Sequence, residues 1–252
     1  MADHFACIGY RFENQEDWNT LIVRSAKNGG IIQSNLGYYS LLAPGEGVEV
    51  WTQLDASIEG KIIGCNPHFH GSSRVKVGIT KIWRDEEWPL EGSLHCWSNP
   101  DEQNPEQGDY PFVVDVPDLD LAYENLACPG YVTLQLAAFA HQLECYRDEE
   151  TYYNSQSRQR KFAAESFFPT GLYQQPPEGE QTTPPATAIF AGHIEAVETR
   201  TNPDSGYEFL YMSIKTLAMT IDVVADSEMV KGEPVVGGIV SGSFWISGRV
   251  VE

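Results

Sequence analysis

The sequence is poor in basic residues. Its 252 residues include 16 Lys and Arg against 36 Asp and Glu, which gives a formal net charge of −20. A surface with this excess of negative charge repels phosphate groups and anionic lipid headgroups. We therefore expect neither a nucleic acid nor a membrane among the partners of this protein.

Long apolar runs are also missing. No stretch of 18 consecutive apolar residues occurs, so the sequence predicts no transmembrane helix. The first residues, MADHFACIGYRF, lack the basic segment and the long apolar segment that form a secretory signal. We therefore expect a cytoplasmic location.

The cysteines are few and follow no recognisable pattern. Their number is odd, their spacing is wide, and no Cys-x-x-Cys pair occurs. This distribution argues against a disulfide framework and against a zinc site built from thiolates. Free and mostly buried thiols in a reducing compartment are the expected state. The five residues are Cys7, Cys65, Cys96, Cys128 and Cys145.

Motifs that mark common enzyme classes are absent as well. The sequence has no Gly-x-Ser-x-Gly nucleophile turn, no phosphate-binding Walker loop, no dinucleotide fingerprint and no His-Glu-x-x-His helix. It therefore identifies no catalytic residue and no cofactor-binding residue. This favours a protein that is not an enzyme.

A series of strands fills the C-terminal part of the chain. Between residues 186 and 251, about five apolar segments alternate with turn-forming segments such as 202–206. Gly242 and Gly248 lie inside the last segment, where glycines mark the bends that close a small barrel. The pattern predicts a small barrel of the OB type. The aromatic residues expected in its core are Phe209, Tyr211 and Trp245.

The charge of this predicted barrel opposes one common role of OB-folds. Residues 186–252 hold four basic and nine acidic residues. Proteins that bind single strands need a positively charged groove with exposed aromatic rings. We therefore expect no affinity for single-stranded DNA or RNA, despite the predicted fold.

The same region resembles the C-terminal part of a family of uncharacterised bacterial proteins. The resemblance covers roughly the last third of the chain. It rests on the segments 166–172 (SFFPTGL), 221–226 (IDVVAD) and 242–248 (GSFWISG). It implies an OB-like barrel and no particular activity.

The N-terminal part predicts a β-α-β-β-β order. Residues 5–12 form the expected first strand, and Asn14 caps a helix that ends before Gly29. Strands follow within residues 31–54. This order resembles one module of the vicinal-oxygen-chelate (glyoxalase-like) fold, over about 50 residues. The resemblance implies a divalent metal held by His4 and Glu49.

Two further histidines are candidate metal ligands. His68 and His70 are two positions apart, so on a strand both imidazoles would lie on one face and could share a metal. Two ligands do not complete a metal site. The alternative is a pair of hydrogen-bonded or solvated histidines.

The middle of the chain predicts further strands at 75–83, 94–97 and 110–116. The apolar stretch 131–146 fits a strand, or a helix from about residue 134. Residues 174–187 contain four prolines and indicate a linker. We therefore predict an α+β, mostly β protein with an N-terminal α+β domain (1–165) and a C-terminal OB-like barrel (166–252).

These observations favour a binding or interaction protein whose partner is a protein or a small molecule, with no cofactor. The alternative is a metal-dependent, glyoxalase-like enzyme. Its candidate ligands are His4, Glu49, His68 and His70.

Overall fold

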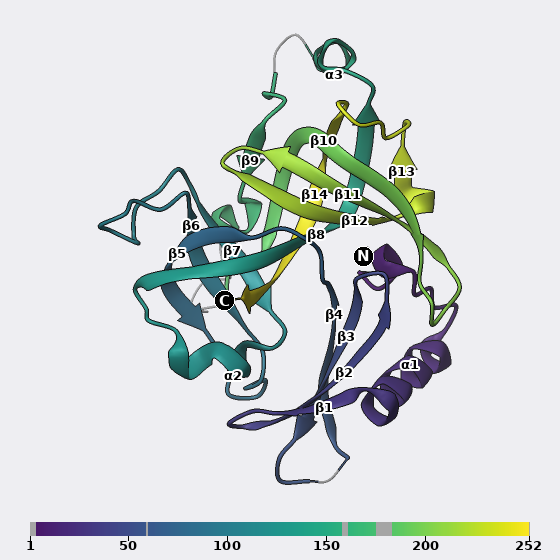
Figure 1. Ribbon diagram of the computed structural model, residues 1–252, viewed down its shortest axis with the longest axis vertical. Coiled ribbons are helices and arrows are strands. Elements are labelled where there is room, and N and C mark those ends of the chain that lie inside the picture. The colour runs from purple at the N-terminus through teal and green to yellow at the C-terminus, as the bar shows by residue number, and fades with distance from the viewer. Residues whose placement is uncertain (1–3, 59, 158–160, 175–182, 252) are drawn as a thin grey trace.

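The computed structural model describes residues 4–58, 60–157, 161–174 and 183–251 (Figure 1). The fold is α+β and mostly β, as predicted. Within these residues, no helix is both long and apolar enough to cross a membrane.

The chain begins with two helical elements that lead into a small sheet, and a large sheet follows. The first half contains η1 (Ala6–Ile8), α1 (Gln15–Asn28), β1 (Gly30–Gln33), β2 (Gly37–Gly45), β3 (Val48–Asp55), β4 (Ile62–Phe69), β5 (Val75–Trp83), β6 (Gly92–Ser98), β7 (Pro111–Val116), α2 (Leu119–Ala122) and η2 (Tyr123–Asn125). The second half contains β8 (Gly130–Tyr146), α3 (Glu149–Ser155), β9 (Ser166–Phe168), η3 (Thr170–Tyr173), β10 (Thr187–Thr201), β11 (Glu208–Thr216), β12 (Met219–Asp226), η4 (Ser227–Met229), β13 (Val230–Lys231) and β14 (Ile239–Val251).

The predicted first strand at residues 5–12 is wrong. This segment contains the 3-10 turn η1, which ends at Gly9 in the left-handed region (φ 80°). Phe5, Ile8 and Tyr10 are buried in one apolar cluster with residues of the large sheet. The apolar character of the segment therefore reflects burial of a compact turn and not strand pairing.

The predicted helix is confirmed as α1. Asn14 caps it, because its side-chain oxygen accepts hydrogen bonds from the backbone N–H groups of Glu16 and Asp17 (2.8 and 3.1 Å). Ser25 faces the small sheet and is hydrogen-bonded to Thr52 of β3 (2.8 Å). One face of this sheet is thus covered by α1.

The small sheet has four antiparallel strands in the order β1-β2-β3-β4. Residues 66–69, which include His68, belong to β4. Glu49 of β3 lies directly opposite His68 of β4, and Trp51 lies opposite Asn66. Directly opposed residues of an antiparallel pair share a face, so these four side chains point away from α1.

The large sheet has ten strands and forms two rings that share β8 and β14 (Figure 1). One ring runs β8-β12-β11-β10-β14, and the other runs β8-β5-β6-β7-β14. The longest pairing joins β14 to β8, from Ile239↔Tyr146 to Val251↔Thr133. These two strands therefore hold the large sheet together.

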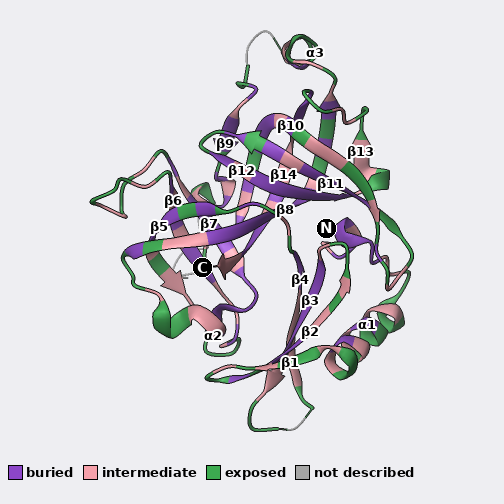
Figure 2. Ribbon diagram, in the orientation of Figure 1, coloured by how far each residue is buried: buried purple, intermediate pink, exposed green. Residues whose placement is uncertain are grey.

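The stretch 131–146 is a strand and not a helix. Leu134 and Leu136 belong to the main core, while Ala137 and Phe139 belong to the cluster that faces η1 and the small sheet. Figure 2 shows β8 buried along most of its length. Burial on both faces gives an apolar run without alternation, and such a run is compatible both with the 3.6-residue period of a helix and with the two-residue period of a strand.

The predicted domain boundary between residues 165 and 166 falls within one shared sheet. The five strands expected after residue 186 are present, but their ring also contains β8, which precedes the boundary. Part of the proposed linker, 175–182, lies outside the described residues. The division into two domains stays a prediction.

Candidate functional site

The candidate site lies where the small sheet meets β14. Alternate residues of β3 and β4 place polar and aromatic side chains on the face that is opposite α1. On β14, Trp245, Ser247 and Arg249 likewise share the face that is turned away from the main core, because Phe244 and Ile246 point into that core. The small-sheet residues in this layer are Glu49, Trp51, Gln53, Asn66 and His68.

Arg249 is the charged centre of this layer. Its Nε donates to Asp118 Oδ2 (2.8 Å), and its Nη1 lies 3.3 Å from Glu49 Oε2. The guanidinium carbon also lies 4.3 Å from the ring centroid of Trp51. Trp51 Nε1 in turn donates to Glu49 Oε2 (2.8 Å). Arg249 therefore joins β14 to β3 through one cation, two carboxylates and one indole.

His68 occupies the next position in the layer and is fully buried. Its Nε2 lies 2.6 Å from Gln135 Oε1, and its Nδ1 lies 2.8 Å from Ser247 Oγ. An amide oxygen only accepts hydrogen bonds, so Nε2 carries the proton and Nδ1 accepts from Ser247. Burial lowers the pKa of His68 to about 4, so the ring is neutral at pH 7.

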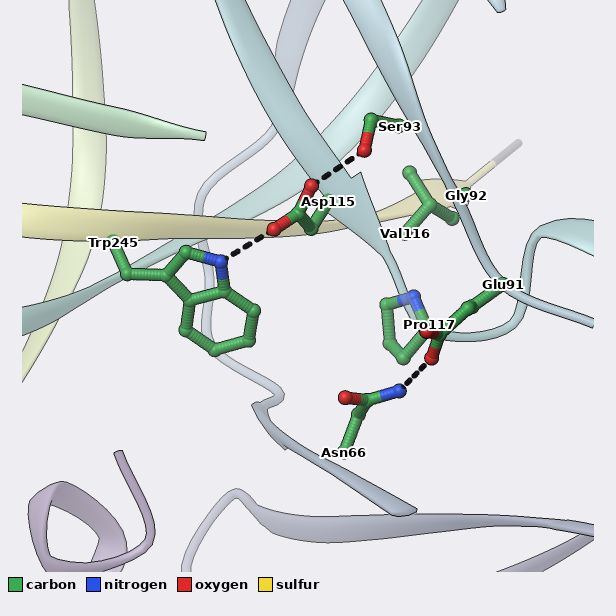
Figure 3. Close-up of a pocket in the computed structure, with 8 residues that line it drawn as sticks. All are labelled: Asn66, Glu91, Gly92, Ser93, Asp115, Val116, Pro117 and Trp245. Atoms are coloured by element: carbon green, nitrogen blue, oxygen red, sulfur yellow. Dashed lines mark hydrogen bonds between the residues drawn. The ribbon is translucent and has the colours of Figure 1, made fainter. Parts of the chain in front are cut away.

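A cavity of about 150 Å³ opens beside this network (Figure 3). Trp245 forms one side, and the Glu91 and Asn66 side chains form another (Figure 3). Gln53 lies behind them and donates to Glu91 Oε2 (2.8 Å). The lining residues are Asn66, Glu91, Gly92, Ser93, Asp115, Val116, Pro117 and Trp245.

The Gln53 amide has room only because its neighbour on β4 is a glycine. A Cβ built on Gly64 would lie 2.2 Å from Gln53 Oε1. Any larger residue at position 64 would displace the amide that holds Glu91. The glycine therefore supports the cavity wall from the neighbouring strand.

Asp115 is the second carboxylate of the cavity. Ser93 Oγ donates to its Oδ1 and Trp245 Nε1 donates to its Oδ2, both at 2.6 Å (Figure 3). Burial raises the pKa of Asp115, and the negative charge of Glu91 raises it further, against the effect of these two donors. The cavity therefore holds two nearby acids, and one of them, Asp115, is desolvated.

The structure brings three of the four predicted metal ligands near one another, namely Glu49, His68 and His70, and gives His4 other partners. His4 Nε2 lies 2.8 Å from His141 Nε2, and the His4 ring stacks on Trp245. His70 Nδ1 lies 3.8 Å from Glu49 Oε1, whereas His68 is hydrogen-bonded on both ring nitrogens. Within the described residues, no group of three or more His, Cys, Asp or Glu side chains is arranged to hold a metal. The metal site that the glyoxalase-like resemblance implies, with His4 and Glu49 as ligands, stays a prediction.

Several residues of the site have no signal in the sequence. Glu91, the pair Asp115 and Asp118, and Arg249 lie in three separate segments, and only the pairing of distant strands brings these segments together. Trp245 was expected in the core, but it is partly buried and lines the cavity. The other two aromatic residues, Phe209 and Tyr211, are buried as expected.

Comparison of this chain with protein-family models, with curated proteins and with solved structures found no match.

Proposed function

We propose that this protein is a binding protein without enzymatic activity, and that a small molecule binds in the cavity beside Trp245. The observation that supports it is the convergence of polar side chains from β4, β6, β7 and β14 on one concave space. Concave sites with a few converging polar groups and an aromatic wall are typical of ligand-binding sites. A cavity of about 150 Å³ accommodates a ligand of roughly the size of benzene.

A fragment screen tests this proposal. Ligand-observed NMR with compounds of benzene size or smaller should identify binders, and Asn66→Phe should abolish their binding because the larger ring fills the cavity. Asn154→Phe is the matched control, since Asn154 is exposed on α3. The proposal fails if no fragment binds, or if the binders bind Asn66→Phe equally well.

A cytoplasmic location is part of the same proposal. Cys65, Cys96, Cys128 and Cys145 are free thiols, and Cys7, Cys96 and Cys145 are buried. Free thiols are typical of a reducing compartment, which supports this part of the proposal.

The glyoxalase-like enzyme is the second proposal. One observation favours it, namely that His70 and Glu49 lie side by side on the rim of the small sheet. Elemental analysis of protein purified without chelator tests it. Near-stoichiometric transition metal that is lost in His70→Gln would support the enzyme, and trace amounts far below one equivalent would remove it.

A further inference from the structure

The cavity has more hydrogen-bond acceptors than donors. Its side-chain donors are directed at its own carboxylates, because Ser93 and Trp245 donate to Asp115 and Asn66 donates to Glu91. Glu91 Oε1 and Asn66 Oδ1 have no hydrogen-bond partner among the described residues. A carboxylate only accepts, so the Asn66 amide must present its nitrogen to Glu91 and its oxygen elsewhere. A ligand that fits this cavity must therefore bring N–H or O–H donors.

The charge of the cavity is uncompensated. Among the described residues, neither Glu91 nor Asp115 lies within 4.0 Å of a Lys, Arg or His nitrogen. Two buried acids nearby do have such a partner, because Asp118 pairs with Arg249 and Asp120 pairs with Arg84, whereas Glu91 and Asp115 are half-buried and have none in the described part of the chain. Buried carboxylates in proteins are normally paired with a cation. In this cavity the ligand is the remaining source of positive charge.

The aromatic side chain of the cavity, Trp245, also favours a positively charged ligand. Trp245 lines the cavity, and its N–H is fixed on Asp115. Indole is the best aromatic partner for a cation, especially where water is excluded. The cavity volume of about 150 Å³ limits the ligand to a few non-hydrogen atoms.

We propose that the ligand of this cavity is a small organic cation with N–H donors, a guanidinium or primary ammonium compound, held by Glu91, Asp115 and the Trp245 ring. This inference rests on the proposed small-molecule binding function and names its ligand class. The ammonium or guanidinium hydrogens donate to the unused oxygens of Glu91 and Asn66. The positive charge compensates the two acids.

Three planar probes of similar size and different charge test the ligand class. Guanidinium, urea and nitrate are each titrated at low millimolar concentration and matched ionic strength, with Trp fluorescence and calorimetry as readouts. We expect guanidinium to bind at least about tenfold more tightly than urea, and nitrate not to bind, because the acids favour positive charge. Methylammonium should compete with guanidinium for the same site.

Two charge-neutralising variants locate the binding. Glu91→Gln should weaken guanidinium binding about tenfold or more. Glu87→Gln is the matched control, because it removes the same charge from an exposed position four residues earlier. Thermal melting of both variants shows that they are folded. Equal binding of guanidinium to wild type and Glu91→Gln would overturn the inference.

The possible outcomes separate this inference from the proposed function. Suppose that urea, nitrate or neutral fragments bind the wild type but not Asn66→Phe, and that guanidinium binds neither. The ligand class is then wrong and the binding function stands. If no probe and no fragment binds, the proposed function itself fails.

Discussion

At the scale of single residues, His68 shows how burial controls protonation. The imidazole has no exposed surface, and its two nitrogens face a hydroxyl and an amide oxygen. Neither partner carries a charge that would stabilise an imidazolium ion. Desolvation therefore dominates and lowers the pKa to about 4, although the nearby Glu49 acts in the opposite direction.

This shift predicts that the protein loses stability as the pH falls below neutrality. An unfolded chain protonates His68 near its ordinary pKa of about 6.5, whereas the folded chain does so only near 4. Between these values the unfolded state binds more protons, so the free energy of unfolding decreases as the pH falls. We expect this residue to contribute a loss of about 2 kcal/mol between pH 7 and pH 5.

Urea unfolding of wild type, His68→Gln and His70→Gln at both pH values measures this contribution. The loss should be smaller in His68→Gln by about 2 kcal/mol, because glutamine has no proton to gain. His70 is exposed and serves as the control. The same pH dependence in all three proteins would contradict the assignment.

At the scale of elements, Arg249 is the main charged link between the two sheets. We predict that Arg249→Met destabilises the protein by about 3–5 kcal/mol, because it leaves Glu49 and Asp118 buried without a cation. The exposed Arg147 provides the matched control, and Arg147→Met should change the free energy of unfolding by less than about 0.5 kcal/mol. Chemical denaturation at pH 7 measures both values.

A second set of variants separates the loss of the cation from a packing defect. If unpaired charge is the cause, adding Glu49→Gln and Asp118→Asn to Arg249→Met should recover part of the stability, because neutral amides lower the desolvation penalty. If the triple variant is less stable than Arg249→Met alone, the unpaired charges are not responsible.

The elements also show what the sequence was able to predict. Sequence patterns predicted the elements that depend on residues close together in the chain. Asn14 caps α1, and the strand predicted at residues 75–83 is β5. They failed at residues 5–12, where a short turn is apolar because the large sheet covers it. They left 131–146 undecided because β8 is buried on both faces.

The site was less predictable than the fold for a related reason. Glu49 was selected from the glyoxalase-like resemblance and His68 from its spacing to His70, and both lie in the polar layer. Their partners, Arg249 and Gln135, are far away in sequence, and the strand pairing that brings them close follows from the whole topology. When the neighbouring side chains are unknown, the residue type alone does not tell a ligand-binding residue from a residue in an ion pair.

At the scale of the whole molecule, the shared sheet predicts how the chain responds to cleavage. We expect limited proteolysis to cut first within residues 174–187, where prolines and polar residues dominate. The two pieces should then remain together, because β8 of one piece pairs with β14 of the other along thirteen residue pairs. Size-exclusion chromatography of the cleaved protein should show one peak, which separates only in denaturant.

Two results would contradict this expectation. Primary cleavage within residues 75–83 would place the accessible segment elsewhere. A C-terminal piece that elutes alone and retains cooperative unfolding would show that residues 166–252 fold independently of β8, as a separate barrel domain would.

The charge distribution of the whole molecule predicts that it does not bind single-stranded nucleic acid. Binding of such strands depends on Lys and Arg side chains that displace counterions from phosphates. Residues 186–252 contain four basic residues, and each already pairs with a carboxylate: Arg200 with Glu198, Lys215 with Glu165, Lys231 with Glu144, and Arg249 with Glu49.

Stacking does not offer an alternative route to such binding. Base stacking on aromatic rings contributes about 1–3 kcal/mol per base where the rings are exposed along a groove. Phe209 and Tyr211 are buried, and Trp245 is fixed between Asp115 and His4. A titration with fluorescein-labelled oligonucleotides at low salt should therefore show no saturable binding in the micromolar range. Saturable binding that Lys215→Glu abolishes and Lys27→Glu leaves intact would prove this prediction wrong, because it would require a positive groove on the C-terminal strands despite the net charge of −20.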